Sequence, residues 1–309
     1  MFRAVEIAGM GCPNNVFLAP LAGYTNYPFR KMLLHLSAGL AFTEMVSAKG
    51  LHYGSEETKK LLYCGEESPK AAQIFGCDPA IMREACESEA LAPFDFIDIN
   101  MGCPMRKIIG NGEGSALMEN FPLAEKVVSE CVRSGKRISV KFRTGIKKGD
   151  KLAAEFAKLC EGAGACMVTV HGRTRDMIYA GEPDYGEIAR TKNAVKIPVF
   201  ANGGIFSRAD AEKMMNETGA DGVTIARAAL YDLNIFNEIT GQAPVPVLPQ
   251  FIRLVKEEKE LFGEQFALVF TRKIAAFLLK GQEGAAEKRR RFFECKSTEE
   301  VIELARKYF

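Results

Sequence analysis

The sequence predicts an α/β fold, a (β/α)8 TIM barrel followed by a small all-helical domain at the carboxyl end. Short β-rich runs alternate with helical patterns through about residue 241, as expected for parallel βαβ units. Some runs, such as MVTV at 167–170, are apolar without alternation, which is typical of strands buried on both faces. The 309 residues also exceed the roughly 250 of a typical barrel, which leaves room for a second domain.

Eight runs are the expected barrel strands. Between them lie amphipathic stretches such as LAEKVVSECVRSG and KLAAEFAKLCEGAG, with apolar residues at helical spacing and glycine at the exit. An open, doubly wound sheet is the alternative arrangement of the same elements. The expected strands span 16–19, 41–46, 71–76, 96–100, 138–142, 167–171, 198–201 and 222–226.

The alternation stops at Gln242, where QAPVPVLP reads as a proline-rich linker. Only helical patterns follow, so we expect a barrel domain at 1–241 and a helical domain at 242–309. Residues 241–309 carry 13 Lys and Arg against 10 Asp and Glu, whereas the rest of the chain is slightly acidic. The cluster Lys288–Arg291 favours an acidic partner, although a solvated helix face explains it equally well.

Composition excludes several other classes. No apolar run approaches the ~18 residues of a membrane helix, and the first residues lack a signal-peptide core, so we expect a cytoplasmic protein. The nine cysteines form no CxxC pair and the chain has three histidines, which indicates reduced thiols and no metal site. No pair of carboxylates stands out at the expected strand ends, and GxSxG and Walker loops are missing, which disfavours hydrolases and kinases.

In barrel enzymes the chemistry lies at the carboxyl ends of the strands. The first strand runs into APLAGYT at 19–25, a tight turn that allows close approach of a planar ligand. The third contains Gln73, which is either a ligand contact or a satisfied core amide. The fourth ends in DINMGCP at 98–104, where Asn100 and Cys103 leave the strand together. A thiol is mostly protonated at neutral pH, which suits a proton donor at least as well as a nucleophile.

The remaining strand ends carry cations and glycines. Lys141 and Arg143 point to one side of the fifth strand by alternation, and His171 stands at the tip of the sixth, before Gly and two arginines. ANGGI at 201–205 and GADGVTIAR at 219–227 end the last two strands. Barrels often bind phosphate in these two loops, so Gly203, Gly204 and Arg227 are a predicted phosphate site.

Taken together, these motifs resemble the tRNA-dihydrouridine synthases, most closely their bacterial B-type branch. The resemblance runs from about residue 16 to residue 306 and is most specific in DINMGCP followed by VKFRTG. Further matches are LAPLAGYTNYPFR, TEMVSAKG, QIFG, VHGRTR, ANGGI and GADGVTIAR, in this order, and TRKIAAFLLKGQEGAAEKRRR resembles the family's RNA-binding helical domain.

The resemblance implies a flavoenzyme that uses FMN, with NADPH (or NADH) as reductant, to saturate the C5–C6 double bond of a uracil in tRNA. Hydride would reach carbon 6 and Cys103 would deliver a proton to carbon 5, while Asn100 and Arg143 hold the uracil. The base would be turned out of the folded tRNA. The implied flavin contacts are Pro20, Leu21, Ala22, Gln73, Lys141 and His171, and those of its phosphate end are Asn202, Gly203, Gly204, Ala226 and Arg227.

The chain departs from the family pattern at Gly204, Ala226 and Tyr185, where Asp, Gly and Trp are commoner. Two rival interpretations remain open. One is an FMN-dependent free-pyrimidine oxidoreductase resembling dihydroorotate dehydrogenase, and the other is a non-catalytic RNA-binding protein on a barrel scaffold. We expect a monomer without metal or membrane partners.

Overall fold

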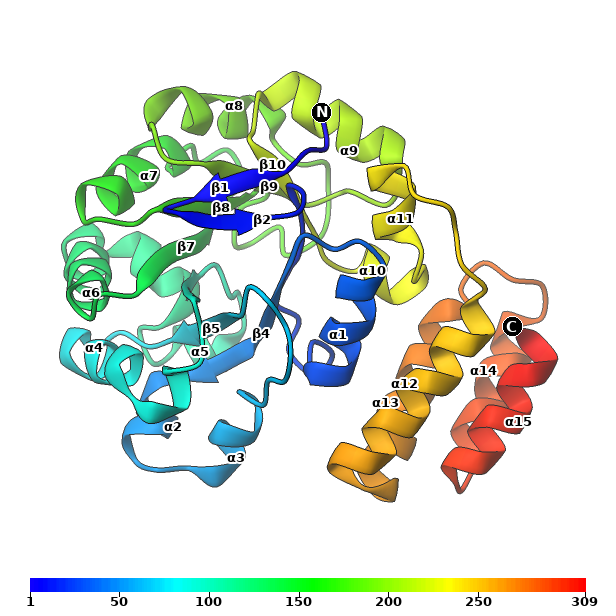
Figure 1. Cartoon of the computed structure of the whole chain (residues 1–309). Coiled ribbons are helices and arrows are strands. Elements are labelled where there is room, and N and C mark those ends of the chain that lie inside the picture. Colours follow the sequence, from blue (N-terminus) through cyan, green and yellow to red (C-terminus); the bar gives the residue numbers. More distant parts are fainter.

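The computed structural model, which describes residues 1–309, contains a closed barrel of eight parallel strands (Figure 1). Each strand pairs with the next along the chain, and the last pairs with the first. The predicted fold class is therefore confirmed, and the open sheet is excluded. The strands are β3 (Val16–Leu18), β4 (Leu40–Ser47), β5 (Ala71–Phe75), β6 (Phe96–Met101), β7 (Arg137–Arg143), β8 (Met167–His171), β9 (Val199–Asn202) and β10 (Gly222–Ile225).

Helices cover the outside of the barrel. Several begin at a polar side chain that caps free backbone N–H groups, for example Asn26 before α1 and Asp78 before α4, each followed by a proline in the first turn. They are α1 (Tyr27–His35), α2 (Ala48–His52), α3 (Glu56–Lys60), α4 (Pro79–Glu87), α5 (Arg106–Ile109), α6 (Phe121–Arg133), α7 (Ala153–Gly162), α8 (Tyr185–Ala194), α9 (Arg208–Thr218), α10 (Ala228–Tyr231) and α11 (Ile235–Thr240). Two 3-10 turns lie at Glu89–Leu91 and Gly114–Glu119.

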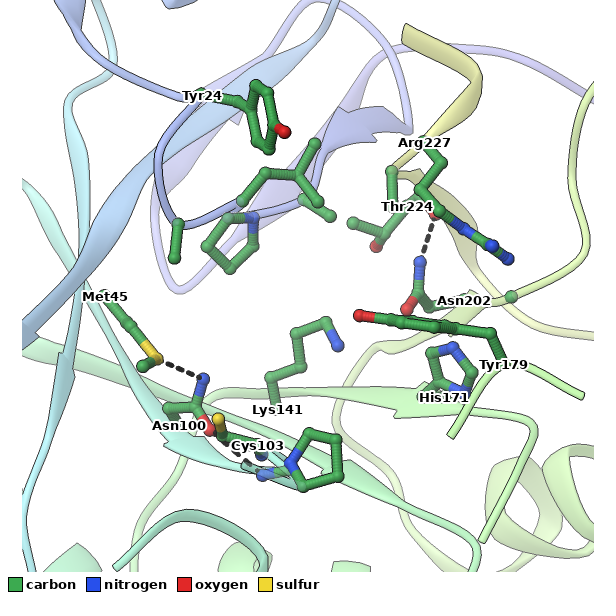
Figure 2. A pocket seen from close by; sticks show the side chains of 18 of the residues that line it. Tyr24, Met45, Asn100, Cys103, Lys141, His171, Tyr179, Asn202, Thr224 and Arg227 are labelled. Atoms are coloured by element: carbon green, nitrogen blue, oxygen red, sulfur yellow. Dashed lines mark hydrogen bonds between the residues drawn. The ribbon is translucent and has the colours of Figure 1, made fainter. Parts of the chain in front are cut away.

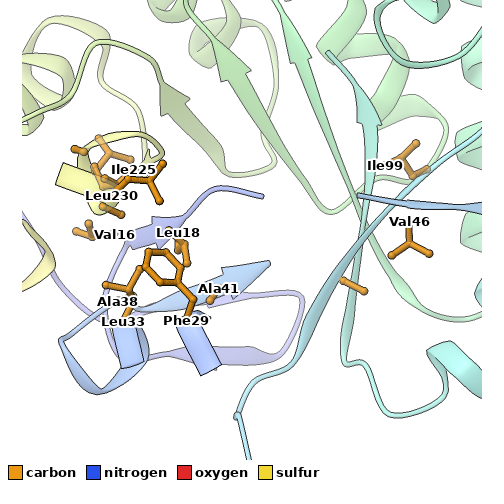
Figure 3. Close-up of a cluster of buried hydrophobic side chains, with 14 of the residues drawn as sticks. Val16, Leu18, Phe29, Leu33, Ala38, Ala41, Val46, Ile99, Ile225 and Leu230 are labelled. Carbon is orange, nitrogen blue, oxygen red and sulfur yellow. The ribbon is translucent and has the colours of Figure 1, made fainter. Parts of the chain in front are cut away.

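The main core fills the space between the strands and these helices. Figure 3 shows part of it, where Leu18 and Ala41 of neighbouring strands meet Phe29 and Leu33 of α1. All four side chains are buried, so this contact removes apolar surface from water and fixes α1 against the sheet. None of the helices combines the length and apolar composition that crossing a bilayer would require.

A short hairpin closes the amino end of the barrel, and the sequence analysis did not predict it. Its strands, β1 (Val5–Ile7) and β2 (Met10–Cys12), pair antiparallel. Ile7 and Met10 pack against aromatic side chains from the first residues of the barrel strands, including Phe17 and Phe200, whose rings stack at 4.3 Å. This apolar plug leaves the carboxyl end as the side that ligands can enter.

The region after α11 is entirely helical, as predicted. Its helices are α12 (Val247–Phe262), α13 (Glu264–Leu278), α14 (Ala285–Glu294) and α15 (Thr298–Tyr308). The chain leaves α11 at Gly241, whose φ of 79° ends the helix. α12 packs against α1 and α13 against α10, so the helical region lies beside the carboxyl end of the barrel. The division at 241/242 stays a prediction.

One buried carboxyl group joins this region to the barrel. Glu258 of α12 is fully buried and accepts hydrogen bonds from Asn26 Nδ2 at 2.7 and 2.9 Å. Burial raises its pKa to about 8. Between its unfolded pKa, near 4.3, and pH 8, the folded protein holds a proton that the unfolded chain has lost. Stability should therefore fall as pH rises through that window.

We expect Glu258→Gln to stabilise the protein at pH 8 and to have little effect at pH 4.5. The glutamine carbonyl still accepts from Asn26, and the charged form is gone. Because one pKa unit corresponds to about 1.4 kcal/mol and the pKa rises from about 4.3 to about 8, the gain at pH 8 should be roughly 4–5 kcal/mol. Chemical denaturation at the two pH values measures it. Glu257→Gln is the control, since Glu257 pairs with Lys31 and Arg253 and its loss should bring no gain.

Candidate functional site

The carboxyl ends of the strands surround a cavity of about 500 Å³. Every site residue predicted from the sequence lies on its wall, although these residues come from seven different strand ends. They are Pro20, Leu21, Ala22, Gln73, Asn100, Cys103, Lys141, Arg143, His171, Asn202, Gly203, Gly204, Ala226 and Arg227. The structure thus brings the whole predicted set together, while the ligand that each one binds stays a prediction.

Strand register explains this convergence. Asn100 is the register partner of Lys141 on the next strand, and Arg143 faces His171, which in turn faces Asn202. Because alternate residues of a barrel strand point inward, these side chains reach the mouth in a common layer. Figure 2 shows Lys141 extended towards the centre of the cavity, with Asn100 and Cys103 on one side and His171 and Asn202 on the other.

The turn that carries Cys103 is held by hydrogen bonds. Asn100 Oδ1 accepts from Gly102 N at 3.1 Å and from Cys103 N at 2.9 Å, while Ser115 Oγ donates to the Cys103 carbonyl at 2.8 Å. Burial raises the pKa of the half-buried thiol above its ordinary value, although the Met105 backbone N–H and the charges of Arg143 and Lys141 oppose this. The thiol is therefore protonated at neutral pH, the form that can donate a proton.

A buried carboxylate lies beneath this turn, and the sequence analysis did not identify it as part of the site. Asp98 accepts from Gln73 Nε2 at 2.6 Å and from Ser139 Oγ at 2.5 Å. Gln73 Oε1 in turn accepts from Asn100 Nδ2 at 2.9 Å. Burial raises the pKa of Asp98 to about 6. A carboxylate only accepts hydrogen bonds and a backbone N–H only donates them. Asp98 at one end of this hydrogen-bond series and the Cys103 N–H at the other therefore fix the orientation of the Gln73 and Asn100 amides.

Arg143 is buried and donates hydrogen bonds to three backbone carbonyls, which the sequence did not predict. The residue is 4% exposed; Nε donates to the Gly102 carbonyl at 2.8 Å, and Nη1 donates to the carbonyls of Thr174 and Ile178 at 3.0 Å each. Ile178 has φ 52°, an uncommon conformation for a β-branched residue. Arg143 therefore joins the Cys103 turn to the loop after β8, and leaves Nη2 as its free donor group.

Burial among cations lowers the pKa of both Lys141 and His171, yet the two side chains differ in charge at pH 7. Burial, with the nearby charge of Arg143, lowers the pKa of Lys141 to about 8, while Asp98 opposes this. Burial and the charges of Lys141, Arg143, Arg173 and Arg227 hold the pKa of His171 well below its ordinary value. His171 is therefore neutral at pH 7, and Lys141 is largely a cation.

The loops after β8, β9 and β10 form a polar cradle around Gly203. A side chain at Gly203, which has φ 110°, would come within 3.3–3.4 Å of His171 and Arg173. His171 Nδ1, Arg173 Nη1 and Thr224 Oγ1 are buried and have no hydrogen-bond partner within the protein. Buried donors without an acceptor are costly, so this cradle fits a polar or anionic group from outside the chain.

Sequence reasoning missed several residues of the cavity. Thr224 of the cavity wall and Arg173, which lies beside Gly203, are inside quoted motifs, two residues from Ala226 and His171, so their position was a usable signal. The aromatic rim was missed as well, because Tyr24, Phe206 and Phe277 come from separate segments of the chain that only the fold brings together. Tyr179 stands beside His171 (Figure 2), with its ring 4.4 Å from the Arg227 guanidinium carbon.

The basic cluster Lys288–Arg291 is partly neutralised within its own helix. Arg290 pairs with Glu287 at 2.7 Å and with Glu294 at 2.6 Å, and Arg291 pairs with Glu287 at 3.1 Å. Lys288 and Arg289 carry no ion pair of this kind. Part of the charge that the sequence offers to an acidic partner is therefore already balanced by carboxylates.

Comparison with known families gives a match along nearly the whole chain. The family model described as dihydrouridine synthase matches residues 17–309. A tRNA-dihydrouridine synthase B from Pseudomonas aeruginosa is 37% identical, covering 99% of this chain and 96% of the relative. The tRNA-dihydrouridine synthase B of Vibrio parahaemolyticus is 33% identical, with 99% and 98% covered.

Solved structures give the same barrel at low identity. Morphinone reductase matches with a TM-score of 0.56 and 12% identity, covering 79% of this chain and 90% of that one. The old yellow enzyme homologue from Zymomonas mobilis matches with a TM-score of 0.54 and 11% identity, covering 79% and 93%. At these identities the likeness concerns the fold alone.

Proposed function

The chain belongs to the dihydrouridine synthase family, and we propose that it is a flavin-dependent oxidoreductase that reduces the C5–C6 double bond of specific uridines in tRNA. The observation that carries this proposal is the family match at 17–309 together with a cavity in which the Cys103 thiol stands among Asn100, Lys141 and Arg143. A free-pyrimidine oxidoreductase is not favoured, because the match extends through the whole helical region.

The cavity fits FMN as the cofactor. His171 Nδ1, Arg173 Nη1 and Thr224 Oγ1 are buried without partners, and Arg173 Nη1 and the His171 ring lie against Gly203, which suits the phosphate end of the molecule. Gly203 and Gly204, both with positive φ, leave room for close approach to the backbone. Pro20, Leu21 and Ala22 offer an apolar wall to a flat ring, and Gln73, Lys141 and His171 polar contacts to its edge.

The protein's own residues divide the remaining work. The hydride for carbon 6 of the uracil would come from FMN bound in the cavity, after its reduction by NADPH or NADH. The Cys103 thiol gives its proton to carbon 5, and its S–H bond breaks as the C–H bond forms. The positive charges of Lys141 and Arg143 and the Met105 backbone N–H favour the thiolate left behind, and solvent returns the proton. Asn100 and the free Nη2 of Arg143 are the groups available to the uracil.

The helical region is the proposed tRNA-binding domain, at 242–309. It lies beside the open end of the barrel, and α13 contributes Phe277 to the cavity wall. A base buried in folded tRNA must be turned out to enter such a cavity. Contacts outside the barrel to the RNA backbone would hold the molecule while this happens.

The purified protein should be yellow, bind FMN in an equimolar ratio and form dihydrouridine in unmodified tRNA when NADPH is added. Flavin absorbance measures the first two properties, and mass spectrometry of digested tRNA measures the third through a gain of two mass units per uridine. Free uridine should be a far poorer substrate, because it lacks the contacts of the helical region. A colourless protein without flavin uptake, or one that reduces free pyrimidines and not tRNA, would contradict the proposal.

A further inference from the structure

A group of aromatic and basic side chains lies at the edge of the cavity, where the helical region meets the barrel. Tyr24 follows β3, Phe206 follows β9 and Tyr231 ends α10, while Lys273 and Phe277 are on α13 and Lys280 lies in the turn just after it. We call this group the seam cluster. Its members are Tyr24, Phe206, Tyr231, Lys273, Phe277 and Lys280.

The rings of the seam cluster form a continuous series. Phe206 and Tyr231 stack, with centroids 6.2 Å apart and an angle of 26° between the rings. Phe277 meets Tyr231 edge-on at 5.5 Å and Tyr24 edge-on at 5.5 Å. Three of these rings, those of Tyr24, Phe206 and Phe277, line the cavity itself. The series therefore runs along the rim of the cavity, and Phe206 is its exposed ring.

Two lysines of the cluster lie over aromatic rings, and only Lys273 has carboxylates near enough to interact with its charge, those of Glu44 and Glu258. Lys280 Nζ lies 4.0 Å from the Tyr231 ring centroid, and Lys273 Nζ lies 5.0 Å from that of Tyr24 and donates to the Gly23 carbonyl at 3.1 Å. Neither forms an ion pair, in contrast with Arg290. Cations placed on aromatic faces are held in position while their charge stays available to an anion.

Packing between the barrel and the helical region does not account for the whole cluster. Side chains that only joined the two parts would be buried, yet Phe206 is 45% exposed and Lys280 is exposed. An exposed ring near cations that form no ion pair suits single-stranded nucleic acid, where bases stack on rings and phosphates lie beside cations. A uridine that enters the cavity stays joined to a nucleotide on each side, so single-stranded RNA lies at the edge of the cavity.

We propose that the seam cluster is a binding subsite for the nucleotides that flank the reduced uridine. A neighbouring base stacks on the exposed ring of Phe206, and the phosphates lie near Lys273 and Lys280. This inference rests on the proposed function, because it takes tRNA as the substrate. It assigns the recognition of the neighbouring strand to a surface built by the barrel and α13 together, rather than to the paired arginines of α14.

The test compares Phe206→Ala and Lys280→Gln with two matched controls in the flavin-loaded, full-length protein. Tyr63→Ala removes an aromatic ring of similar exposure, 44%, on the barrel, where it does not line the cavity. Lys126→Gln removes an exposed lysine without an ion pair on α6. A dye-labelled, unmodified tRNA transcript is titrated with each variant at several salt concentrations, and dihydrouridine formation is followed on the same RNA.

Phe206→Ala should weaken tRNA binding about 10-fold, within the range measured for loss of one base–aromatic stack. Lys280→Gln should lower the salt slope of log K by about 0.7, the value for one phosphate of a single strand. Flavin absorbance should stay unchanged, KM should rise and kcat should change little. Both control variants should bind tRNA as the wild type does.

Two results overturn the subsite: seam variants that bind tRNA as tightly as the wild type, or controls that lose as much affinity. Failure of the proposed function has a different signature, because the wild type itself would then form no dihydrouridine. A wild type that reduces tRNA while Phe206→Ala and Lys280→Gln remain unaffected contradicts the seam cluster alone.

Discussion

Cys103→Ala is expected to abolish nearly all dihydrouridine formation while leaving flavin binding and NADPH oxidation intact. The substitution removes the proposed proton donor and changes no group of the cradle around Gly203. Proton transfer by a positioned side chain typically contributes 10²–10⁴-fold to a rate, so a loss of about 1,000-fold in single-turnover reduction of tRNA is expected. Rapid mixing of the reduced enzyme with tRNA, followed by mass spectrometry, measures that step separately from flavin reduction.

Two further variants sharpen the result. Cys103→Ser keeps a hydroxyl in the same place, but that group ionises far less readily than a thiol, so it should restore little of the rate. Cys166→Ala is the control, since this half-buried cysteine precedes β8 at the opposite end of the barrel and its Sγ donates to the Ile138 carbonyl at 3.2 Å. Normal product yield from Cys103→Ala would remove this thiol from the mechanism.

The barrel could be predicted from the sequence because its strands obey simple rules. A strand buried on both faces needs a near-continuous apolar run. The carboxyl ends of all the parallel strands lie at the same end of the barrel. Unusual residues after such runs, such as Cys103 and His171, therefore had to meet in space. The hairpin β1–β2 escaped prediction because its strands are only three residues long, too short for a pattern of alternation to be recognised.

Hydrogen-bond networks within the site could not be predicted in the same way. Asp98 and Ser139 look like ordinary strand residues, and only the register of β5, β6 and β7 places them beside Gln73. The buried Glu258 is similar, because its partner Asn26 lies 232 residues away in the sequence. Contacts of this kind depend on exact packing, whereas the convergence of strand ends depends only on topology.

The role of Arg143 shows how the structure refines a prediction made from sequence. The resemblance assigns it to the uracil, and the cavity is consistent with that contact through Nη2. The structure adds three carbonyl partners, one of them in the turn before Cys103. An arginine with a planar fork of donors can serve both purposes at once, whereas a lysine has a single nitrogen on a flexible stem.

Arg143→Lys should therefore lower the rate constant of tRNA reduction about 100-fold while tRNA binding changes only a few-fold. Lysine keeps the positive charge near the Cys103 thiol, so a loss of rate reflects lost geometry rather than lost charge. Because a buried carbonyl without a donor costs about 1–3 kcal/mol, the variant should also be less stable by about 2 kcal/mol or more. Single-turnover rates, tRNA titration and chemical denaturation measure the three quantities.

The alkylation rate of Cys103 shows whether Arg143 holds the turn before this cysteine or only binds the uracil. If Arg143 fixes the turn through the Gly102 carbonyl, its replacement should free the thiol, and iodoacetamide should modify Cys103 several-fold faster at a pH where the thiolate fraction is known. Peptide mass spectrometry separates this cysteine from the other eight. If Arg143 only contacts the base, the alkylation rate of the tRNA-free enzyme should not change, and tRNA affinity should carry the whole effect. The three carbonyl contacts favour the first outcome, because they exist before any substrate arrives.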